Sequence, residues 1–295
     1  MTEKDSLIKN VYPDLNQYDS TTVQPPKVPT PDYDVSNTKG NKIYDFINTY
    51  KINPLFSEKL DLLKNYKIVL LIDDSGSMNT KLSDSKYETR WDELKDVIKI
   101  VISITSIYNK NGIDVNFLNR RNYKNIKSIE EIQEIFNERP SGLTPLTSKL
   151  NDLFNNNSNS DKPLLIIIPT DGLPSENGEN GETGEIEVKS FENLLKNRNS
   201  TKFLISFLAC SNDEKEIGYL RKIKKKIKNI SILSDYNSKF KEIATIENSN
   251  FKYTEDSNFK YTLGDHTIRL LLNPVCSEIT SFEKKNLKKN LCNIL

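Results

Sequence analysis

KIVLLIDDSGS, residues 67–77, is the stretch that decides the fold. Its first seven residues form a continuous apolar run rich in β-branched side chains, which is typical of a strand buried on both faces of a parallel sheet. Asp73 stands at the end of that run, and Ser75 and Ser77 follow at alternate positions on a turn that contains Gly76. The stretch therefore predicts a buried strand whose carboxyl end carries one acidic and two hydroxyl side chains.

Buried strands and amphipathic helices alternate along the chain after this stretch. We expect further strands at 113–118, 163–170, 202–209 and 230–233, and helices at 57–66, 90–108, 128–138, 145–155, 185–196 and 214–226. Such alternation predicts an α/β fold with a doubly wound, mostly parallel sheet and helices on both faces, a Rossmann-like arrangement. Ligands of such sheets bind beyond the carboxyl ends of the strands, at a topological switch point.

Composition shifts divide the chain into three predicted parts. Residues 1–42 are expected to be a disordered tail, because the segment TTVQPPKVPTPDYD clusters prolines and polar residues without an apolar period. Residues 43–248 are expected to form the α/β domain. Residues 249–295 are a C-terminal extension, in which SNFKYT occurs twice between residues 249 and 262, a pattern compatible with a hairpin, followed by helices expected at 266–272 and 281–291.

The overall charge gives no sign of a nucleic-acid or membrane partner. The chain of 295 residues has a formal net charge of +1, with 42 Lys and Arg against 41 Asp and Glu. Its apolar runs are strand-sized, so we expect no membrane span. The three cysteines are Cys210, Cys276 and Cys292, which lack any CxxC spacing, and the N-terminus has no signal-peptide core. We therefore expect a cytoplasmic protein.

Two later loops carry further oxygen side chains. Thr144 stands just before the helix expected at 145–155, and Asp171 follows the strand expected at 163–170 in a Thr-Asp-Gly turn. In a doubly wound sheet these loops can meet the Asp73 loop at one edge. Hard divalent cations prefer oxygen ligands of this kind. The three loops therefore offer the oxygen side chains of Asp73, Ser75, Ser77, Thr144 and Asp171 to a cation at this edge.

This pattern resembles the metal-ion-dependent adhesion site of the von Willebrand factor A family. The resemblance covers roughly residues 65–240 and includes the order of elements, the Arg90-Trp91 start of the long helix and the GIDV strand. It implies direct ligation by the Ser75 and Ser77 hydroxyls. It also implies that Thr144 ligates directly in one state and through water in another, while the two aspartates ligate directly or through water. The family also shows a second arrangement with a shifted final helix, so the resemblance implies a switchable site.

The function that the resemblance implies is metal-dependent protein binding, in an adhesion or scaffold role and without catalysis. The expected cation is Mg²⁺, with Mn²⁺ or Ca²⁺ as alternatives. The remaining coordination position would take an Asp or Glu of a partner protein or of a second copy of this chain. Two features depart from the family: Thr147 stands where members often have glycine, and residues 175–187 form an acidic, glycine-rich insertion beside Asp171, interpreted as a solvated loop.

Four other functions are set against this one. The fold could serve as a structural building block in an assembly, with the tails making the contacts. A Mg²⁺-dependent phosphotransferase would place a second carboxylate where Ser75 stands. A serine hydrolase would need a histidine partner and a G-x-S-x-G elbow, but the elbow is absent and the one histidine, His266, lies in the C-terminal extension. The basic run 221–228 is interpreted as the exposed face of a helix rather than as a nucleic-acid site.

Overall fold

The computed structural model describes residues 38–83, 85–176, 182–248, 261–276 and 279. Six strands of this part form one sheet in the order β3-β2-β1-β4-β5-β6. β3 pairs antiparallel with β2, and every other neighbouring pair is parallel. The strands are β1 (Lys67–Ile72), β2 (Ile113–Phe117), β3 (Tyr123–Ile126), β4 (Leu164–Thr170), β5 (Phe203–Ala209) and β6 (Ile230–Ser234).

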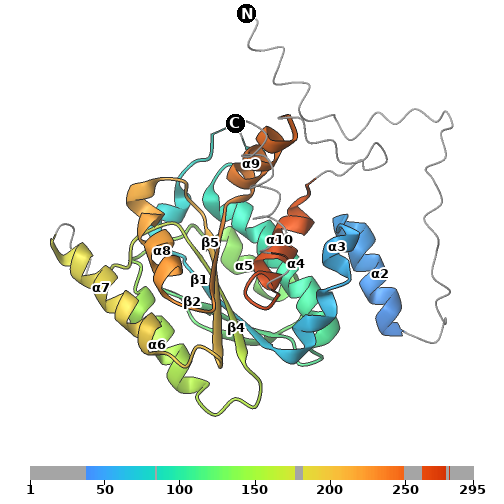
Figure 1. Ribbon diagram of the computed structural model, residues 1–295, viewed down its shortest axis with the longest axis horizontal. Helices are drawn as coiled ribbons and strands as arrows, with labels where there is room; N and C mark the ends of the chain where they lie inside the picture. Colours follow the sequence, from blue (N-terminus) through green and yellow to red (C-terminus); the bar gives the residue numbers. More distant parts are fainter. Residues whose placement is uncertain (1–37, 84, 177–181, 249–260, 277–278, 280–295) are drawn as a thin grey trace, which may run out of the picture. The chain divides into compact units, whose positions relative to one another are not determined.

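Helices cover both faces of this sheet (Figure 1). The α-helices are α2 (Thr38–Tyr50), α3 (Pro54–Ser57), α4 (Arg90–Tyr108), α5 (Gln133–Asn137), α6 (Leu146–Asn156), α7 (Glu182–Asn197), α8 (Glu214–Lys226), α9 (Tyr236–Asn248) and α10 (Leu263–Leu272). Three 3₁₀ helices are η1 (Leu60–Asn65), η2 (Gly76–Asn79) and η3 (Ile129–Ile132). The protein thus has a mixed α/β fold with a mostly parallel sheet, as the alternation of elements predicts.

The core consists of two apolar layers, one on each face of the sheet. On β1, Ile68, Leu70 and Ile72 join the layer that contains α4 and α10, and Val69 and Leu71 join the layer that contains α6, α7 and α8. Figure 1 shows these two sets of helices on opposite sides of the strands. Because alternate side chains of one strand enter different layers, the continuous apolar run of β1 is buried on both faces.

The order of the strands places a topological switch point between β1 and β4. From β1 the chain continues to β2 and β3 on one side, and it then returns to β4, β5 and β6 on the other side. β1 and β4 are paired in parallel, with Leu70 opposite Ile167, and the backbone N–H of Asp73 extends the pairing by donating to Pro169 O at 3.2 Å. The carboxyl ends of β1 and β4 therefore lie side by side, where doubly wound sheets bind ligands.

Several elements differ from the sequence-based expectation. The predicted helix at 57–66 is instead the short α3 followed by η1, and the predicted helix at 128–138 is divided into η3 and α5. The strand β3 and the helices α2 and α9 were not predicted. β3 is short and polar, and its pairing with β2 shifts register, so its four residues carry little periodic signal. α2 begins at Thr38, inside the segment that the sequence analysis assigns to a tail.

The helix expected at 266–272 is α10, which lies in the centre of the fold. It packs against α4, η1 and the strands β4, β5 and β6, and its residues from Gly264 to Leu272 are buried. The Leu270 carbonyl accepts a hydrogen bond from Ser206 Oγ of β5 at 2.6 Å. The predicted hairpin and the helix expected at 281–291 fall outside the described residues, apart from Tyr261 and Thr262.

None of the helices in the described part of the chain is long and apolar enough to cross a membrane.

Candidate metal site

The Asp73 carboxylate is fully buried at the carboxyl end of β1. Its Oδ1 accepts a hydrogen bond from the backbone N–H of Ser75 at 3.0 Å, and its Oδ2 accepts one from Thr170 Oγ1 at 2.6 Å. The first bond folds the chain back over the strand end, as aspartates commonly do in turns. Ser75 and Ser77 then lie with their Oγ atoms 3.1 Å apart, joined by a hydrogen bond.

Asp171 connects this turn to the end of β4. Its Oδ1 accepts a hydrogen bond from Ser77 Oγ at 2.7 Å. Its Oδ2 accepts one from Arg90 Nη1 at 2.6 Å. The side chains of Ser75, Ser77 and Asp171 therefore form a continuous chain of oxygen atoms at the switch point, although they come from loops 94 residues apart.

Thr144 lies on a third loop that is tied to the other two by backbone hydrogen bonds. Gly76 N–H donates to Gly142 O at 3.1 Å, and Ser175 N–H donates to Thr144 O at 2.9 Å. The Thr144 side chain is almost fully buried, and its hydroxyl has no hydrogen-bond partner among the described residues. The structure thus brings the Thr144 loop to the site through its backbone, while no hydrogen bond within the described residues joins the Thr144 hydroxyl to the aspartates or serines.

Gly142 is required by the conformation of this third loop. Its φ of +102° lies in the region that favours glycine, and a Cβ atom there would lie 2.6 Å from Asn119 Oδ1. Asn119 also donates from its backbone and side-chain nitrogens to Asp74 Oδ1, at 2.8 and 3.2 Å. Asp74 forms an ion pair with Arg120 at 3.4 Å. The second aspartate of the sequence stretch therefore supports the loop instead of joining the site.

The electrostatics of the site favour a bound cation. Burial, together with the nearby charge of Asp171, raises the pKa of Asp73 to about 6, although hydrogen bonds from Ser75 and Thr170 oppose the rise. Burial also raises the pKa of Asp171, while hydrogen bonds from Ser77 and Arg90 oppose that rise. The two buried carboxylates repel each other, and the Arg90 guanidinium is paired with Asp171, so a positive ion between the carboxylates would be stabilised.

The donor set suits a hard divalent ion. Asp73, Ser75, Ser77, Thr144 and Asp171 offer only oxygen atoms, and Mg²⁺ binds oxygen ligands while keeping some of its water. Within the described ranges, no cluster of three or more His, Cys, Asp or Glu residues is arranged to hold a metal ion. The candidate site has only two carboxylates, and its other ligands would be hydroxyl groups. The residues therefore fit a Mg²⁺ site that depends on hydroxyl ligands.

Arg90 is a site residue whose role the sequence analysis did not predict. Besides Asp171, its guanidinium donates to Ser211 Oγ at 3.1 Å and to Glu216 Oε2 at 3.0 Å. Glu216 belongs to the first turn of α8, so this network joins the site to the amino-terminal ends of α4 and α8. The sequence showed Arg90 only as the first residue of a helix, and no local pattern links it to residues 81 and 126 positions away.

Glu176 belongs to the acidic insertion that was interpreted as a solvated loop. Its Oε1 accepts hydrogen bonds from the backbone N–H groups of Thr147 and Ser148 at 2.8 and 3.1 Å. Its Oε2 accepts one from Ser148 Oγ at 2.7 Å. The residue before α6, Pro145, provides no side-chain cap, so Glu176 caps this helix from another loop. At least this part of the insertion therefore has a structural role beside Thr144.

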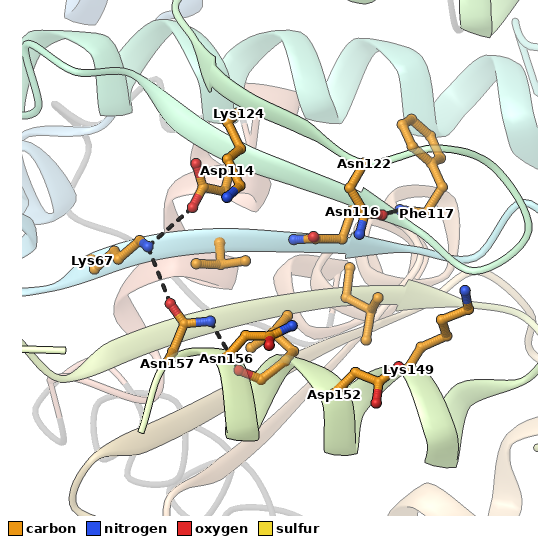
Figure 2. A pocket seen from close by; sticks show the side chains of 13 residues that line it. Lys67, Asp114, Asn116, Phe117, Asn122, Lys124, Lys149, Asp152, Asn156 and Asn157 are labelled. Carbon is orange, nitrogen blue, oxygen red and sulfur yellow. Dashed lines mark hydrogen bonds and ion pairs between the residues drawn. The ribbon is translucent and has the colours of Figure 1, made fainter. Parts of the chain in front are cut away.

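A separate groove of about 470 Å³ crosses the face of the sheet between β2 and α6 (Figure 2). Its polar side chains bond to one another: Lys67 Nζ lies 3.0 Å from Asp114 Oδ2 and donates to Asn157 Oδ1 at 3.1 Å. Val69 and Leu71 of β1 form part of its apolar floor. The lining of the groove contains none of the predicted site residues.

Comparison with known proteins gives only distant structural similarity. The chain is similar to the PilB minor pilin from Streptococcus sanguinis, with 14% sequence identity and a TM-score of 0.44 over 61% of each chain. A single-residue mutant of that pilin gives a TM-score of 0.43 at the same identity and coverage. The chain thus spans about three fifths of the length of the pilin. No protein-family model matches the chain, and no curated protein matches it.

Proposed function

We propose that this chain is a von Willebrand factor A-like domain that binds a protein partner through a divalent cation, with Mg²⁺ as the expected ion. Asp73, Ser75, Ser77, Thr144 and Asp171 are its proposed ligands, and the proposed role is binding without catalysis. The observation that carries the proposal is the hydrogen-bonded chain from Ser75 through Ser77 to Asp171, beside the buried Asp73. This arrangement occurs at the switch point, where doubly wound sheets bind ligands.

The hydrogen-bonded residues would each have a role in such a metal site. Asp73 is oriented by Thr170 and by the Ser75 backbone, so its position does not depend on the ion. Ser77 is exposed between Ser75 and Asp171 and can turn its hydroxyl from Asp171 toward an ion. A bound Mg²⁺ supplies a positively charged coordination position that an incoming carboxylate can fill. With only two carboxylates and one nearby arginine, the site leaves part of the positive charge for that partner.

The network also supports a non-catalytic role. Ser77 donates its hydroxyl hydrogen to Asp171, whose other oxygen is held by Arg90. His266, the one histidine of the chain, is buried in α10 and its Nδ1 is hydrogen-bonded to the Tyr261 hydroxyl at 2.9 Å. A serine nucleophile requires a base within hydrogen-bond reach that can accept its proton. His266 is engaged elsewhere, which leaves the serines as proposed ligands.

Calorimetric titration of Mg²⁺ and Mn²⁺ into the metal-free protein tests this function. We expect one saturable site in the wild type, and about a hundredfold weaker binding in Asp73→Asn. At a Mg²⁺ concentration about a hundred times the Kd, binding should add about 2.7 kcal/mol to the free energy of unfolding of the wild type. The metal-free Asp73→Asn protein should be at least as stable as the wild type, because the substitution removes the repulsion between two buried carboxylates.

Asp152→Asn is the matched control, because it removes an exposed carboxylate of α6 that makes no contact with the site residues. It should bind Mg²⁺ like the wild type. A folded wild-type protein that binds neither ion, or an Asp73→Asn protein that binds as tightly as the wild type, would contradict the proposed function.

A further inference from the structure

Two exposed leucines adjoin the candidate site. Leu143 directly precedes Thr144 and is 42% exposed, and Leu173 follows Asp171 by two residues and is 39% exposed. Among the described residues, the other large hydrophobic side chains with comparable exposure are Tyr44 and Ile186. Isolated exposed leucines are common on protein surfaces, so the informative feature is that both lie on loops of one site.

Both loops are held in place by side chains from elsewhere in the fold. The Leu143 carbonyl accepts a hydrogen bond from Asn119 Nδ2 at 2.8 Å. The carbonyl of Gly172 accepts one from the Tyr219 hydroxyl at 3.1 Å. The exposure of the two leucines is therefore a property of fixed loops, and little conformational entropy would be lost when a partner covers them.

The same loops contact the turn that carries the serines. Gly142, next to Leu143, accepts a hydrogen bond from the backbone N–H of Gly76 at 3.1 Å. A Cβ atom placed on Gly172, next to Leu173, would lie 3.9 Å from Ser77 Oγ. The two leucines thus belong to two different loops that both border the Ser75–Ser77 turn.

Small neutral residues lie beside the two leucines in the described part of the chain. They include Gly76, Ser77, Ser141, Gly142 and Gly172, which are exposed or half-exposed. The charged side chains described beside them are engaged: Asp74 is paired with Arg120, Asp171 with Arg90, and Glu176 is bonded to the start of α6. A cation bound by Ser75, Ser77 and the aspartates would therefore have small neutral residues and two exposed leucines among its neighbours.

We infer that the partner presents a carboxylate with apolar side chains on its flanks, so that the acid reaches the cation while its neighbours cover Leu143 and Leu173. This inference rests on the proposed function and names the chemistry of the partner. Apolar contacts around a central charged contact exclude water from it, and the exclusion of water strengthens the charged contact. A partner whose acidic residue has only charged neighbours would leave both leucines without apolar contacts.

A displayed peptide library tests the inference directly. The peptides carry a fixed central Glu or Asp with randomised flanks, and they are selected on the full chain in Mg²⁺ and released with EDTA. We expect the selected peptides to carry Leu, Ile, Val, Met or Phe beside the acidic residue. Each single substitution, Leu143→Ser or Leu173→Ser, should weaken their binding by about three- to tenfold, through the loss of buried apolar area.

Two controls separate the contribution of the leucines from that of the ion. The double variant, which combines Leu143→Ser and Leu173→Ser, should bind Mg²⁺ itself with unchanged affinity, because neither leucine is a proposed ligand. Tyr44→Ser removes an exposed apolar side chain from α2 and should leave peptide binding unchanged.

Each remaining outcome overturns the inference in a distinguishable way. Mg²⁺-dependent peptides without apolar flanks, or equal affinity for the double variant, would overturn the inference and leave the metal site standing. Mg²⁺-dependent self-association of the chain that is lost in the double variant would show a second copy, not a separate partner, on this surface. An absence of Mg²⁺ binding to the wild type would overturn the proposed function together with the inference.

Discussion

At the scale of single residues, Arg90 sets the charge balance of the candidate site. Its guanidinium contacts Asp171, Ser211 and Glu216, and its side chain is only 10% exposed. In the absence of a cation it partly offsets the negative charge of Asp171. The same positive charge would repel an ion that Asp171 helps to bind, so Arg90 is expected to limit the metal affinity.

Replacement of Arg90 should therefore separate metal affinity from stability. We expect Arg90→Gln to bind Mg²⁺ about tenfold more tightly in calorimetric titration, a change of about 1.4 kcal/mol. The metal-free variant should be about 2–4 kcal/mol less stable in urea, because buried Asp171 loses its charged partner. Arg121→Gln, which removes a guanidinium bonded to Tyr123, is the control. Unchanged or weaker Mg²⁺ binding by folded Arg90→Gln would instead assign Arg90 to positioning Asp171.

Glu93, in the first turn of α4, makes stability depend on pH. Burial raises its pKa to about 7, and Asp235 acts in the same direction, while the backbone N–H of Tyr236 and the charge of Lys86 oppose the rise. An acid whose folded pKa lies above its unfolded value of 4.5 holds more protons in the folded state. Its contribution to stability is therefore present below pH 4.5 and is lost as the pH rises through 7.

The isosteric substitution Glu93→Gln should remove this loss. We expect the variant to gain about 1–3 kcal/mol over the wild type between pH 5 and pH 8, measured by urea unfolding at both pH values. Comparison with the wild type at each pH cancels the titration of all other groups, including His266, whose pKa is lowered by burial to about 3. A difference that does not change between the two pH values would show that Glu93 titrates normally in the folded protein.

At the scale of elements, the site is made by three strand-end loops and by the helices that begin there. α4 begins with a capping box formed by Thr89 and Asp92, which the sequence signature of a helix start can reveal. α6 begins differently, because its cap is Glu176 from the loop after β4. This cap ties the loop of Asp171 to the helix that follows Thr144, so the two loops are expected to be stabilised together.

Removal of this cap tests the coupling of the two loops. We expect Glu176→Ala to cost about 1–2 kcal/mol in urea unfolding of the metal-free protein, since two helix N–H groups and a helix dipole lose a charged acceptor. Glu176→Gln, which keeps an acceptor oxygen but loses the charge, should cost less. Because the cap also positions the loop of Thr144, weaker Mg²⁺ binding should accompany the loss of stability in Glu176→Ala. Equal stability of all three proteins would show that the cap contributes nothing.

At the scale of the whole molecule, α10 packs against residues 50–53, a segment more than 200 residues earlier in the chain. The backbone N–H of Asn53 donates to Asp265 Oδ1 at 2.7 Å. Gly264 lies against this segment so closely that a Cβ atom would be 2.3 Å from Tyr50 O and 2.6 Å from Ile52 Cδ1. A truncation of residues 249–295, which would test an assembly role for the C-terminal extension, would therefore also remove a helix of the core.

A single substitution in α10 measures how much its contact with residues 50–53 contributes to the stability of the protein. We expect Gly264→Ala to destabilise the protein by about 1–3 kcal/mol in urea, because the added methyl group meets the backbone of Tyr50. Gly184→Ala in α7 is the matched control, since nothing lies within 4 Å of its added Cβ, and it should be neutral or slightly stabilising. Mg²⁺ binding should be unchanged in both. A neutral Gly264→Ala would show that α10 can shift away from residues 50–53 at no cost.

Much of the sheet could be predicted from the sequence because a buried parallel strand must be apolar along its whole length. The runs of β1, β4 and β5 differ from the predicted bounds by one residue at most. The same reasoning placed Asp73 and Asp171 at neighbouring strand ends, where Asp73 accepts hydrogen bonds from Ser75 and Thr170, and Asp171 accepts one from Ser77. β3 was missed, since a short polar edge strand is defined by its partner and not by its own residues.

The sequence by itself determined the α/β class, the parallel strands and the three loops that carry Asp73, Thr144 and Asp171, because burial period and turn chemistry are local properties of a chain. Only the tertiary structure decided which distant groups meet at the switch point. Arg90 reaches Asp171, Glu176 caps α6 and α10 enters the core, each through contacts between residues far apart in the chain. Such contacts depend on the packing of elements against one another, which no local sequence period encodes.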